Sequence, residues 1–389
     1  MIDFTPVRAF LEPSHLDLAT RVSEFGARHL TNHAFDHDDG AARARARKIC
    51  DLLGRGGWLS PIVDQDFRAI CVIRESLAFY SPLADAVCAL QALGSTPIAL
   101  AGNEKQRSLW LDRAARGEAI AAFAMTEPNA GSDIAAMCST AIRDGNTYVI
   151  NGIKTFISNA GIADFYLVFA RTNPDAGAHG ISAFLLPADT PGFHFVRPLI
   201  MAEPHPLGEI AFEDCRVPTS ARVGGEGEGF KLGLATLDRL RPTVGAAACG
   251  MAGRALHEAL EHALSREQFG QRLADFQITQ EKLGSMATDL MAARLLVYRA
   301  AWERSEGATH TNVEAAMAKA FATEAAQTIV DDAVQILGGR GVLADHPVDR
   351  LYRSVRALRI YEGATEIQRL IVARHLIDKT QHARQTDSE

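Results

Sequence analysis

Residues 139–159, STAIRDGNTYVINGIKTFISN, mark the point at which the chain changes from a helical to a strand-like pattern. The dipeptides Asp144-Gly145 and Asn151-Gly152 supply the positive φ that two-residue hairpin turns require, so this stretch predicts hairpins. Further strand-like runs follow at 165–171, 181–186, 193–197 and 209–212. Together they predict an antiparallel β-domain over residues 120–224.

The residues before this β-domain have a helical pattern. Apolar side chains recur there at three-to-four spacing, first at Leu16, Ala19, Val22 and Phe25. The apolar stretch 83–100 contains Gly94 and Pro97 and therefore predicts two short helices joined by a turn. We expect residues 1–119 to form an N-terminal helical domain.

Long helical segments return beyond residue 228. The first of them carries an apolar stripe, formed by Leu283, Met286, Leu290, Ala293, Val297 and Ala301. The second opens with Thr311 and Glu314 at capping-box spacing and ends at Gly338-Gly339. Long helices with short connections predict a helical bundle over residues 225–389. The fold class is therefore mainly α with a central β-domain.

The composition is that of a globular protein without a basic surface. The chain has 40 lysines and arginines against 47 aspartates and glutamates, a net charge of −7. This balance disfavours a general nucleic-acid binder, which needs a basic stripe to neutralise phosphates. The six cysteines are scattered without metal-ligand spacing, so we expect reduced core thiols and no metal. The N-terminus is not signal-like and no apolar run approaches ~18 residues, so we expect a cytoplasmic protein outside the membrane.

Several common motifs are missing from the sequence. It has no GxGxxG of a dinucleotide-binding fold and no GxxxxGK[ST] phosphate loop. It also has no HExxH zinc site and no GxSxG nucleophile elbow. If a nucleotide cofactor binds, a different architecture must hold it.

Five other motifs are present. They are AMTEPNAGSD at 124–133, NGIKTFISN at 151–159, REQFG at 266–270, QILGG at 335–339 and YEGATEIQR at 361–369. In sequence and order they resemble the signatures of the acyl-CoA dehydrogenases, a family of flavoproteins, over about residues 80–378. The resemblance implies the family fold, with a barrel-like β-domain and a C-terminal four-helix bundle. In that fold FAD lies between the β-domain and the bundle.

The resemblance also implies which residues meet FAD. At the flavin end these are Phe123, Met125, Thr126, Ser132, Phe156 and Ser158, with Phe156 covering a ring face and the Ser158 hydroxyl reaching N5. The pyrophosphate and adenosine would be bound from a neighbouring subunit by Arg266, Phe269, Gln277, Gln335 and Gly339. A shared cofactor implies an obligate homo-oligomer, and the resemblance implies the family's homotetramer, a dimer of dimers. Beside the base, further contacts fall to Ala364, Thr365 and Glu366, although many members have Thr where this chain has Ala364.

Glu362 matches the family's catalytic base, which takes the substrate α-proton while the β-hydrogen leaves to flavin. Some members carry the base at the position of Leu240, and leucine cannot abstract a proton. Residues expected near the thioester are Ser132, Asp238, Arg241 and Gly363. The product would be a trans-2-enoyl-CoA, and the electrons would pass to an electron-transferring flavoprotein.

Two alternatives remain open. One is a flavin-dependent oxidase or monooxygenase on the same scaffold, which differs in the access of O2 to reduced flavin. The other is a scaffold or interaction protein that kept the fold and lost flavin. Pocket depth depends on residues 85–91, so the sequence leaves the acyl chain undefined.

Overall fold

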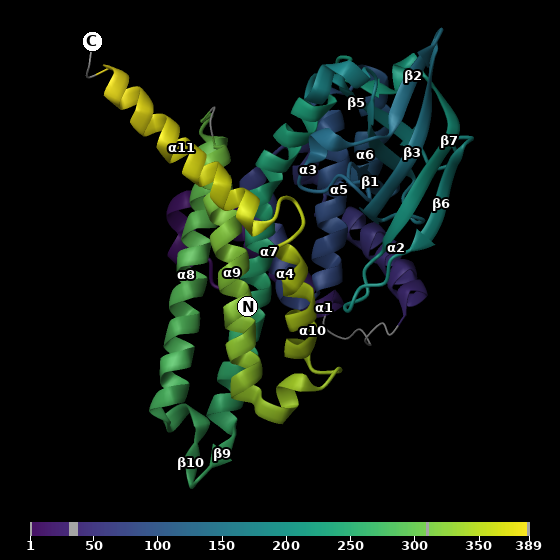
Figure 1. Ribbon diagram of the computed structural model, residues 1–389. Coiled ribbons are helices and arrows are strands. Elements are labelled where there is room, and N and C mark those ends of the chain that lie inside the picture. Colours follow the sequence, from purple (N-terminus) through teal and green to yellow (C-terminus); the bar gives the residue numbers. More distant parts are fainter. Residues whose placement is uncertain (1, 31–37, 309–310, 387–389) are drawn as a thin grey trace. The chain divides into compact units, whose positions relative to one another are not determined.

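The computed structural model describes residues 2–30, 38–308 and 311–386, which divide into two compact units (Figure 1). Within the described residues, unit 1 takes Met1–His33, Phe67–Asp85 and Asp238–Glu389, and unit 2 takes Ala34–Asp66 and Ala86–Leu237. Two helices, α5 (Pro82–Ala101) and α7 (Gly229–Ser265), contribute residues to both units. The division into three domains stays a prediction.

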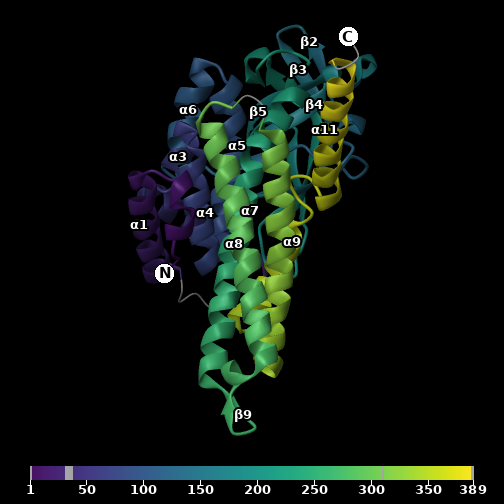
Figure 2. The ribbon, with the colours of Figure 1, turned by 90° about the vertical axis from the view of Figure 1, so that its left-hand side faces the viewer.

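Unit 1 is built mainly from long helices. Besides its part of α7, it contains η1 (Thr5–Phe10), α1 (Pro13–His29), α4 (Phe67–Tyr80), β9 (Glu267–Gln268), β10 (Gln271–Arg272), η5 (Leu273–Asp275), α8 (Gln277–Ser305), α9 (Asn312–Leu337), η6 (Gly338–Val342), α10 (Pro347–Leu358) and α11 (Thr365–Thr386). In both views of the ribbon α8 and α9 lie side by side (Figure 1, Figure 2). The predicted bundle of long helices is confirmed.

The helices α8 and α9 follow the predicted pattern, with one exception. Four members of the α8 stripe are buried, namely Met286, Ala293, Val297 and Ala301. Thr311 precedes α9 as predicted, but the capping box with Glu314 is wrong. The Thr311 side chain makes no cap hydrogen bond, because its hydroxyl accepts one from Arg304 instead. Gly338 ends α9 with a φ of 57°.

Unit 2 contains an eight-stranded sheet with the order β6-β7-β3-β2-β4-β5-β8 and with β1 paired to β4. The strands are β1 (Ala121–Ala124), β2 (Thr140–Asp144), β3 (Thr147–Ser158), β4 (Phe165–Arg171), β5 (Ile181–Pro187), β6 (Phe193–Pro198), β7 (Leu207–Pro218) and β8 (Arg222–Val223). Over residues 121–223, all of which the structure describes, the sheet is open and mixed. The antiparallel, barrel-like expectation is therefore wrong. β1 and β4 pair in parallel, although the hairpin β2–β3 separates them in the sequence.

Only one of the two predicted hairpin turns exists. Asp144 pairs with Thr147, so β2 and β3 are joined by Gly145-Asn146, and Gly145 has a φ of 60°. The turn predicted at Asn151-Gly152 is wrong, because β3 continues through it with a shift of register. Glycine is needed there because a β-carbon on Gly152 would lie 2.2 Å from the Ser139 hydroxyl.

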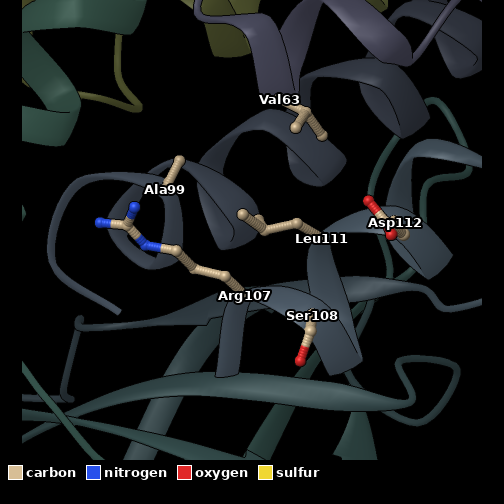
Figure 3. Close-up of a pocket in the computed structure, with 6 residues that line it drawn as sticks. All are labelled: Val63, Ala99, Arg107, Ser108, Leu111 and Asp112. Atoms are coloured by element: carbon tan, nitrogen blue, oxygen red, sulfur yellow. The ribbon is translucent and has the colours of Figure 1, made fainter. Parts of the chain in front are cut away.

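The other elements of unit 2 are α2 (Asp39–Arg55), α3 (Ser60–Asp64), α6 (Glu104–Ala115), η2 (Ile134–Ala136), η3 (Pro174–Gly180) and η4 (Thr219–Ala221), besides its part of α5. Residues of α3, α5 and α6 line a pocket of about 350 Å³ (Figure 3). Its lining residues are Val63, Ala99, Arg107, Ser108, Leu111 and Asp112. None of them belongs to the five sequence motifs, so this pocket is not the predicted cofactor site.

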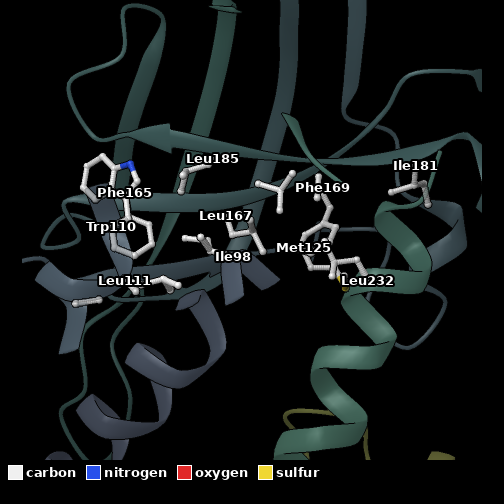
Figure 4. Packing of buried hydrophobic residues seen from close by; sticks show 14 of the residues in the cluster. Ile98, Trp110, Leu111, Met125, Phe165, Leu167, Phe169, Ile181, Leu185 and Leu232 are labelled. Atoms are coloured by element: carbon white, nitrogen blue, oxygen red, sulfur yellow. The ribbon is translucent and has the colours of Figure 1, made fainter. Parts of the chain in front are cut away.

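A buried apolar cluster connects the sheet of unit 2 to α5, α6 and the start of α7. Figure 4 shows Trp110 against Phe165 at one end of it and Met125 beside Leu232 at the other. The ring centroids of Trp110 and Phe165 are 4.8 Å apart. Burying such side chains contributes roughly 1.5–3 kcal/mol each relative to leaving them in water.

The stretch expected to form two short helices is one helix, α5, so that expectation is wrong. Pro97 lies inside it and removes one hydrogen bond of the helix. Gly94 is a point of close approach, because a β-carbon there would lie 2.6 Å from the Ala121 β-carbon. Among the described helices α5 alone is long and apolar enough to cross a membrane, but 72% of that window is buried, as in a core helix.

A buried ion pair fixes the loop after β1. Lys154 Nζ donates to Glu127 Oε1 at 2.7 Å, and both side chains are almost wholly buried. The same carboxylate accepts from the backbone N–H groups of Cys138 and Ser139 at 2.5 and 3.0 Å. Lys154 also donates to the Met125 carbonyl at 3.3 Å. Cys138 itself is exposed, so the expectation that all cysteines are core thiols is wrong for it.

Replacing Gly94 by Ala should lower the free energy of unfolding by about 1–3 kcal/mol, because the added methyl forces α5 away from β1. The measurement is urea unfolding followed by circular dichroism. Gly284→Ala is the matched control, since Gly284 lies in α8 with no atom within 4 Å of its would-be β-carbon. That control should gain about 0.5–1 kcal/mol from helix propensity. Equal effects of the two substitutions would rule out the close-packing explanation.

Replacing Lys154 by Met should lower the free energy of unfolding by about 3–5 kcal/mol, because it leaves the Glu127 carboxylate buried without its counter-ion. The control is Arg216→Met, which breaks an ion pair to Asp144 of the same 2.7 Å length but with side chains 60% and 61% exposed. That change should cost only about 0–1 kcal/mol. Thermal and urea unfolding of both variants would measure the difference. A cost for Lys154→Met no larger than for the control would contradict the role given to the buried pair.

Candidate functional site

Glu362 lies in the loop between α10 and α11, and its backbone has a positive φ of 53°. This conformation costs a residue with a β-carbon about 1–3 kcal/mol, so the surroundings must hold it. Arg241 Nε donates to the Glu362 carbonyl at 3.3 Å. Lys319 Nζ and Gln368 Nε2 donate to the Gly363 carbonyl at 2.7 and 3.1 Å. Three side chains therefore clamp the loop that carries the predicted base.

Neither Lys319 nor Gln368 is among the site residues predicted from the sequence, although both side chains are fully buried. A buried ammonium group needs a partner, and Lys319 finds one in the Gly363 carbonyl. The sequence holds a signal for it. Lys319 stands on a buried face of α9 whose other members are small, namely Ala315, Ala316, Ala322 and Thr323. A lysine in such a face points to a specific polar contact.

The environment of Glu362 makes its carboxylate a stronger base than an exposed glutamate. Burial raises the pKa of Glu362, and this outweighs the opposing effect of the cations Arg74, Lys319 and Arg241. Its Oε2 atom is buried and has no hydrogen-bond partner among the described residues. Burial also lowers the pKa of Lys319 to about 8, against the pull of Glu362. A carboxylate with a raised pKa and an unoccupied oxygen is suited to accepting a proton.

Arg74 and Asp85 form a second buried contact in this part of unit 1. The guanidinium donates to both carboxylate oxygens, at 2.7 and 3.0 Å, and to the Thr243 hydroxyl at 2.7 Å. The two side chains are 1% and 2% exposed, so neither charge has water as an alternative partner. Asp85 raises the pKa of Glu362 while Arg74 lowers it. The two charges of the pair therefore partly offset each other in their effect on the Glu362 pKa.

The structure brings two of the predicted thioester residues close to the Glu362 loop. Asp238 and Arg241 form an ion pair within α7, and Arg241 reaches the Glu362 carbonyl as described above. Leu240, the alternative base position, is 1% exposed and packs in the core. The Thr365 hydroxyl donates to the Arg359 carbonyl at 3.4 Å, so its proton is already used. It does not replace the hydroxyl that Ala364 lacks.

In unit 2, a β-bulge turns two predicted flavin residues outward. Between Lys154 and Ile157 the pairing of β3 with β7 slips by one residue, and Phe156 has a φ of 55°. The extra residue reverses the alternation of the strand, so that Phe156 and Ser158 share the more open face. Phe156 is 65% exposed, which is unusual for a phenylalanine in the middle of a sheet.

The signature loop after β1 approaches the same part of β3. The Thr126 carbonyl accepts a hydrogen bond from the Thr155 N–H at 3.0 Å, one residue before Phe156. Ser132 is exposed and Phe123 is half-buried against Phe169, with ring centroids 4.9 Å apart. Met125, by contrast, places its side chain in the apolar core, so a flavin would meet its backbone.

This part of unit 2 fits a flavin. The outward Phe156 ring supplies a flat apolar surface, and Ser158, two residues along β3 on the same face, supplies a hydroxyl. A ring system with an apolar face and a polar edge needs both. The ion pair of Lys154 with Glu127 fixes the loop that carries Thr126, which makes the surface preformed. The residues of this chain are therefore compatible with FAD.

The five residues predicted to hold the pyrophosphate and adenosine from another subunit all lie at one end of unit 1. Arg266 directly precedes β9, and Phe269 lies in the turn between β9 and β10 (Figure 1, Figure 2). Gln335 lies in the last turn of α9, and Gly339 follows in η6. Together with Gln277 at the start of α8 they are exposed. Phe269 is 95% exposed and has a φ of 53°.

Three family models match the chain in sequence. The N-terminal domain of acyl-CoA dehydrogenase matches residues 12–118, the middle domain 122–215 and the C-terminal domain 227–377. A probable acyl-CoA dehydrogenase of Mycobacterium leprae is 35% identical over 94% of this chain and 96% of its own length. An acyl-CoA dehydrogenase of Bacillus subtilis is 42% identical over 74% of this chain and 76% of its own.

Solved structures agree with these matches. Butyryl-CoA dehydrogenase from Megasphaera elsdenii has a TM-score of 0.87 at 33% identity, covering 97% of this chain and 100% of its own. A chain from a structure titled electron transferring flavoprotein of Acidaminococcus fermentans has a TM-score of 0.88 at 35% identity, with coverages of 96% and 99%. The prolyl acyl carrier protein oxidase AnaB has a TM-score of 0.86 at 28% identity, with coverages of 94% and 99%. The chain therefore belongs to the acyl-CoA dehydrogenase family, whose members depend on FAD.

Proposed function

We propose that this protein removes hydrogen from the α and β carbons of an acyl-CoA thioester, giving a trans-2-enoyl-CoA, with Glu362 as the base. The observation that supports this most is the state of the Glu362 carboxyl. It is buried, its pKa is raised, and its Oε2 has no partner among the described residues. A carboxyl paired for stability alone would have its oxygens occupied.

The thioester α-proton is too weakly acidic for a carboxylate in water, so the site must supply the difference. Burial supplies part of it by raising the pKa of Glu362 and so strengthening it as a base. The N–H of Glu362 donates to no described residue and is open to a thioester oxygen. The clamp of Lys319, Arg241 and Gln368 holds that N–H and the carboxyl in one orientation. FAD, when bound, supplies the acceptor for the β-hydrogen and its electron pair.

We also propose that the protein works as a homotetramer and passes electrons to an electron-transferring flavoprotein in the cytoplasm. The exposed residues Arg266, Phe269 and Gln335 support the first part, because a lone subunit leaves them without a role. A fully exposed phenylalanine at a hairpin tip is typical of a contact with another chain. None of the six cysteines, all of which lie in the described residues, is in a disulfide, which fits a reducing compartment.

The second candidate is an oxidase on the same scaffold, and the 28% identity to AnaB favours it. The two candidates differ in how fast reduced flavin reacts with air. After anaerobic reduction by an acyl-CoA, admission of O2 should give slow reoxidation if the protein is a dehydrogenase. Fast reoxidation by O2 alone would establish the oxidase instead.

Replacing Glu362 by Gln should leave FAD and thioester binding intact and slow anaerobic bleaching near 450 nm by about 10²- to 10⁴-fold, because the amide cannot accept the α-proton. Stopped-flow absorbance with a panel of acyl-CoA thioesters measures this and also reports the preferred acyl chain. Glu306→Gln, an exposed carboxylate at the end of α8, is the control and should bleach normally. Normal bleaching by Glu362→Gln would exclude Glu362 as the base.

The bleaching rate should fall on the acid side with a midpoint above 4.5, the ordinary value for glutamate, because burial raises the pKa of Glu362. The rate is lost as pH falls, since only the carboxylate accepts a proton. Lys319→Met removes a cation that lowers this pKa, so the midpoint should move to higher pH. Lys282→Met, in which the lost lysine pairs with Asp332 on α9, should leave it in place. A shift toward lower pH in Lys319→Met would contradict the electrostatic assignment.

A further inference from the structure

Ser158 has a polar neighbour that no sequence motif includes. His205 Nε2 lies 2.8 Å from Ser158 Oγ. His205 stands just before β7, where Leu207 pairs with Ser158 in register. The Asn159 N–H donates to the Pro206 carbonyl at 2.8 Å, which ties the two segments together next to the pair. The contact between His205 and Ser158 is therefore built into the meeting of β3 and β7.

Arg43 of α2 holds the same two segments from the side. Its guanidinium donates to the Ala160 carbonyl and, at 2.7 Å, to the Leu207 carbonyl, and it pairs with Asp39. Burial and the nearby Arg43 charge lower the pKa of His205 to about 4, while Asp39 opposes them. The imidazole is therefore neutral at physiological pH and carries a single N–H.

The position of that N–H follows from the surroundings. His205 Nδ1 is buried and has no hydrogen-bond partner among the described residues. A proton on Nδ1 would be a buried donor without an acceptor, the kind of unpaired group that folded proteins avoid most strongly. A proton on Nε2 instead donates to Ser158 Oγ at 2.8 Å. The Ser158 oxygen then accepts from His205, and its own hydrogen is free to point elsewhere.

We infer that His205 is a positioning residue that turns the Ser158 hydroxyl into a fixed hydrogen-bond donor toward the flavin. The inference rests on the proposed function, in which Ser158 meets flavin N5. Oxidised flavin N5 is an acceptor, so a serine that already accepts from His205 offers it the correct partner. Phe156 lies on the same outward face two residues earlier, so the ring and the donor approach from one side.

The test is titration of apoprotein with FAD, followed by flavin absorbance, for His205→Ala, His205→Gln, Ser158→Ala and the double variant. His205→Ala should weaken FAD binding by about 2- to 10-fold, the range for one neutral hydrogen bond. His205→Gln carries an amide N–H near the Nε2 position and should restore the affinity. In the Ser158→Ala background, His205→Ala should have no further effect. The flavin midpoint potential should follow the same pattern, shifted in His205→Ala and restored in His205→Gln.

The outcomes separate this inference from the proposed function. Unchanged FAD affinity and potential in His205→Ala would overturn the inference alone. The same loss from His205→Ala with and without Ser158 would also overturn it, because His205 would then act through packing. Circular dichroism and melting of each variant identify any loss that comes from unfolding. If the unsubstituted apoprotein binds no FAD, the proposed function fails and the inference fails with it.

Discussion

Each buried cation near the predicted site residues has a fixed oxygen partner, and the shape of the site depends on this constraint. Lys319 cannot reach water, so its ammonium group must bind the Gly363 carbonyl and thereby holds the loop of Glu362. Lys154 does the same in unit 2, where its partners Glu127 and the Met125 carbonyl set the course of the loop after β1. Because a buried lysine must keep its oxygen partner, each of these two lysines makes the backbone next to the predicted site residues rigid.

The clamp also explains how Glu362 tolerates an unfavourable backbone. A positive φ at a glutamate would normally relax toward an ordinary conformation. Donors from α7, α9 and α11 reach two consecutive carbonyls of the loop, so relaxing one residue would break contacts with the others. The strained backbone holds the carboxyl and the N–H of Glu362 at a fixed distance and angle to each other. A base and a hydrogen-bond donor that act on one substrate need such a fixed geometry.

Much of the fold was predictable from the sequence because it follows from local patterns. The α8 stripe and the end of α9 at Gly338 depend on helical periodicity and on glycine, and both are confirmed. The predictions that are wrong concern contacts between distant residues. Gly94 reads as a helix break, yet it serves close packing against Ala121. Asn151-Gly152 predicts a turn, yet Gly152 makes room for Ser139. The parallel pairing of β1 with β4 produces no periodic pattern in the sequence.

The same distinction applies to the site. The motifs identified Glu362, Phe156 and Ser158 by resemblance, and the roles given to them stay predictions. Lys319 can be noticed in the sequence as a charged residue among small ones. Nothing in the sequence marks Gln368 and His205, because their partners come from other parts of the chain. Neither propensity nor spacing reveals the electrostatic state of Glu362, which depends on Arg74, Lys319 and Asp85 together.

The bulge in β3 has a consequence for how this family can diverge. Because the bulge between Lys154 and Ile157 decides which side chains face outward beyond it, the identity of the surface depends on the pairing register as well as on side-chain type. Closing the bulge at constant chain length would slip the pairing with β7 by one residue and turn Phe156 and Ser158 toward the interior, while the sheet could still pair. A substitution that favours regular pairing at this point could therefore erase the flavin-facing surface of a descendant without changing Phe156, Ser158 or the fold.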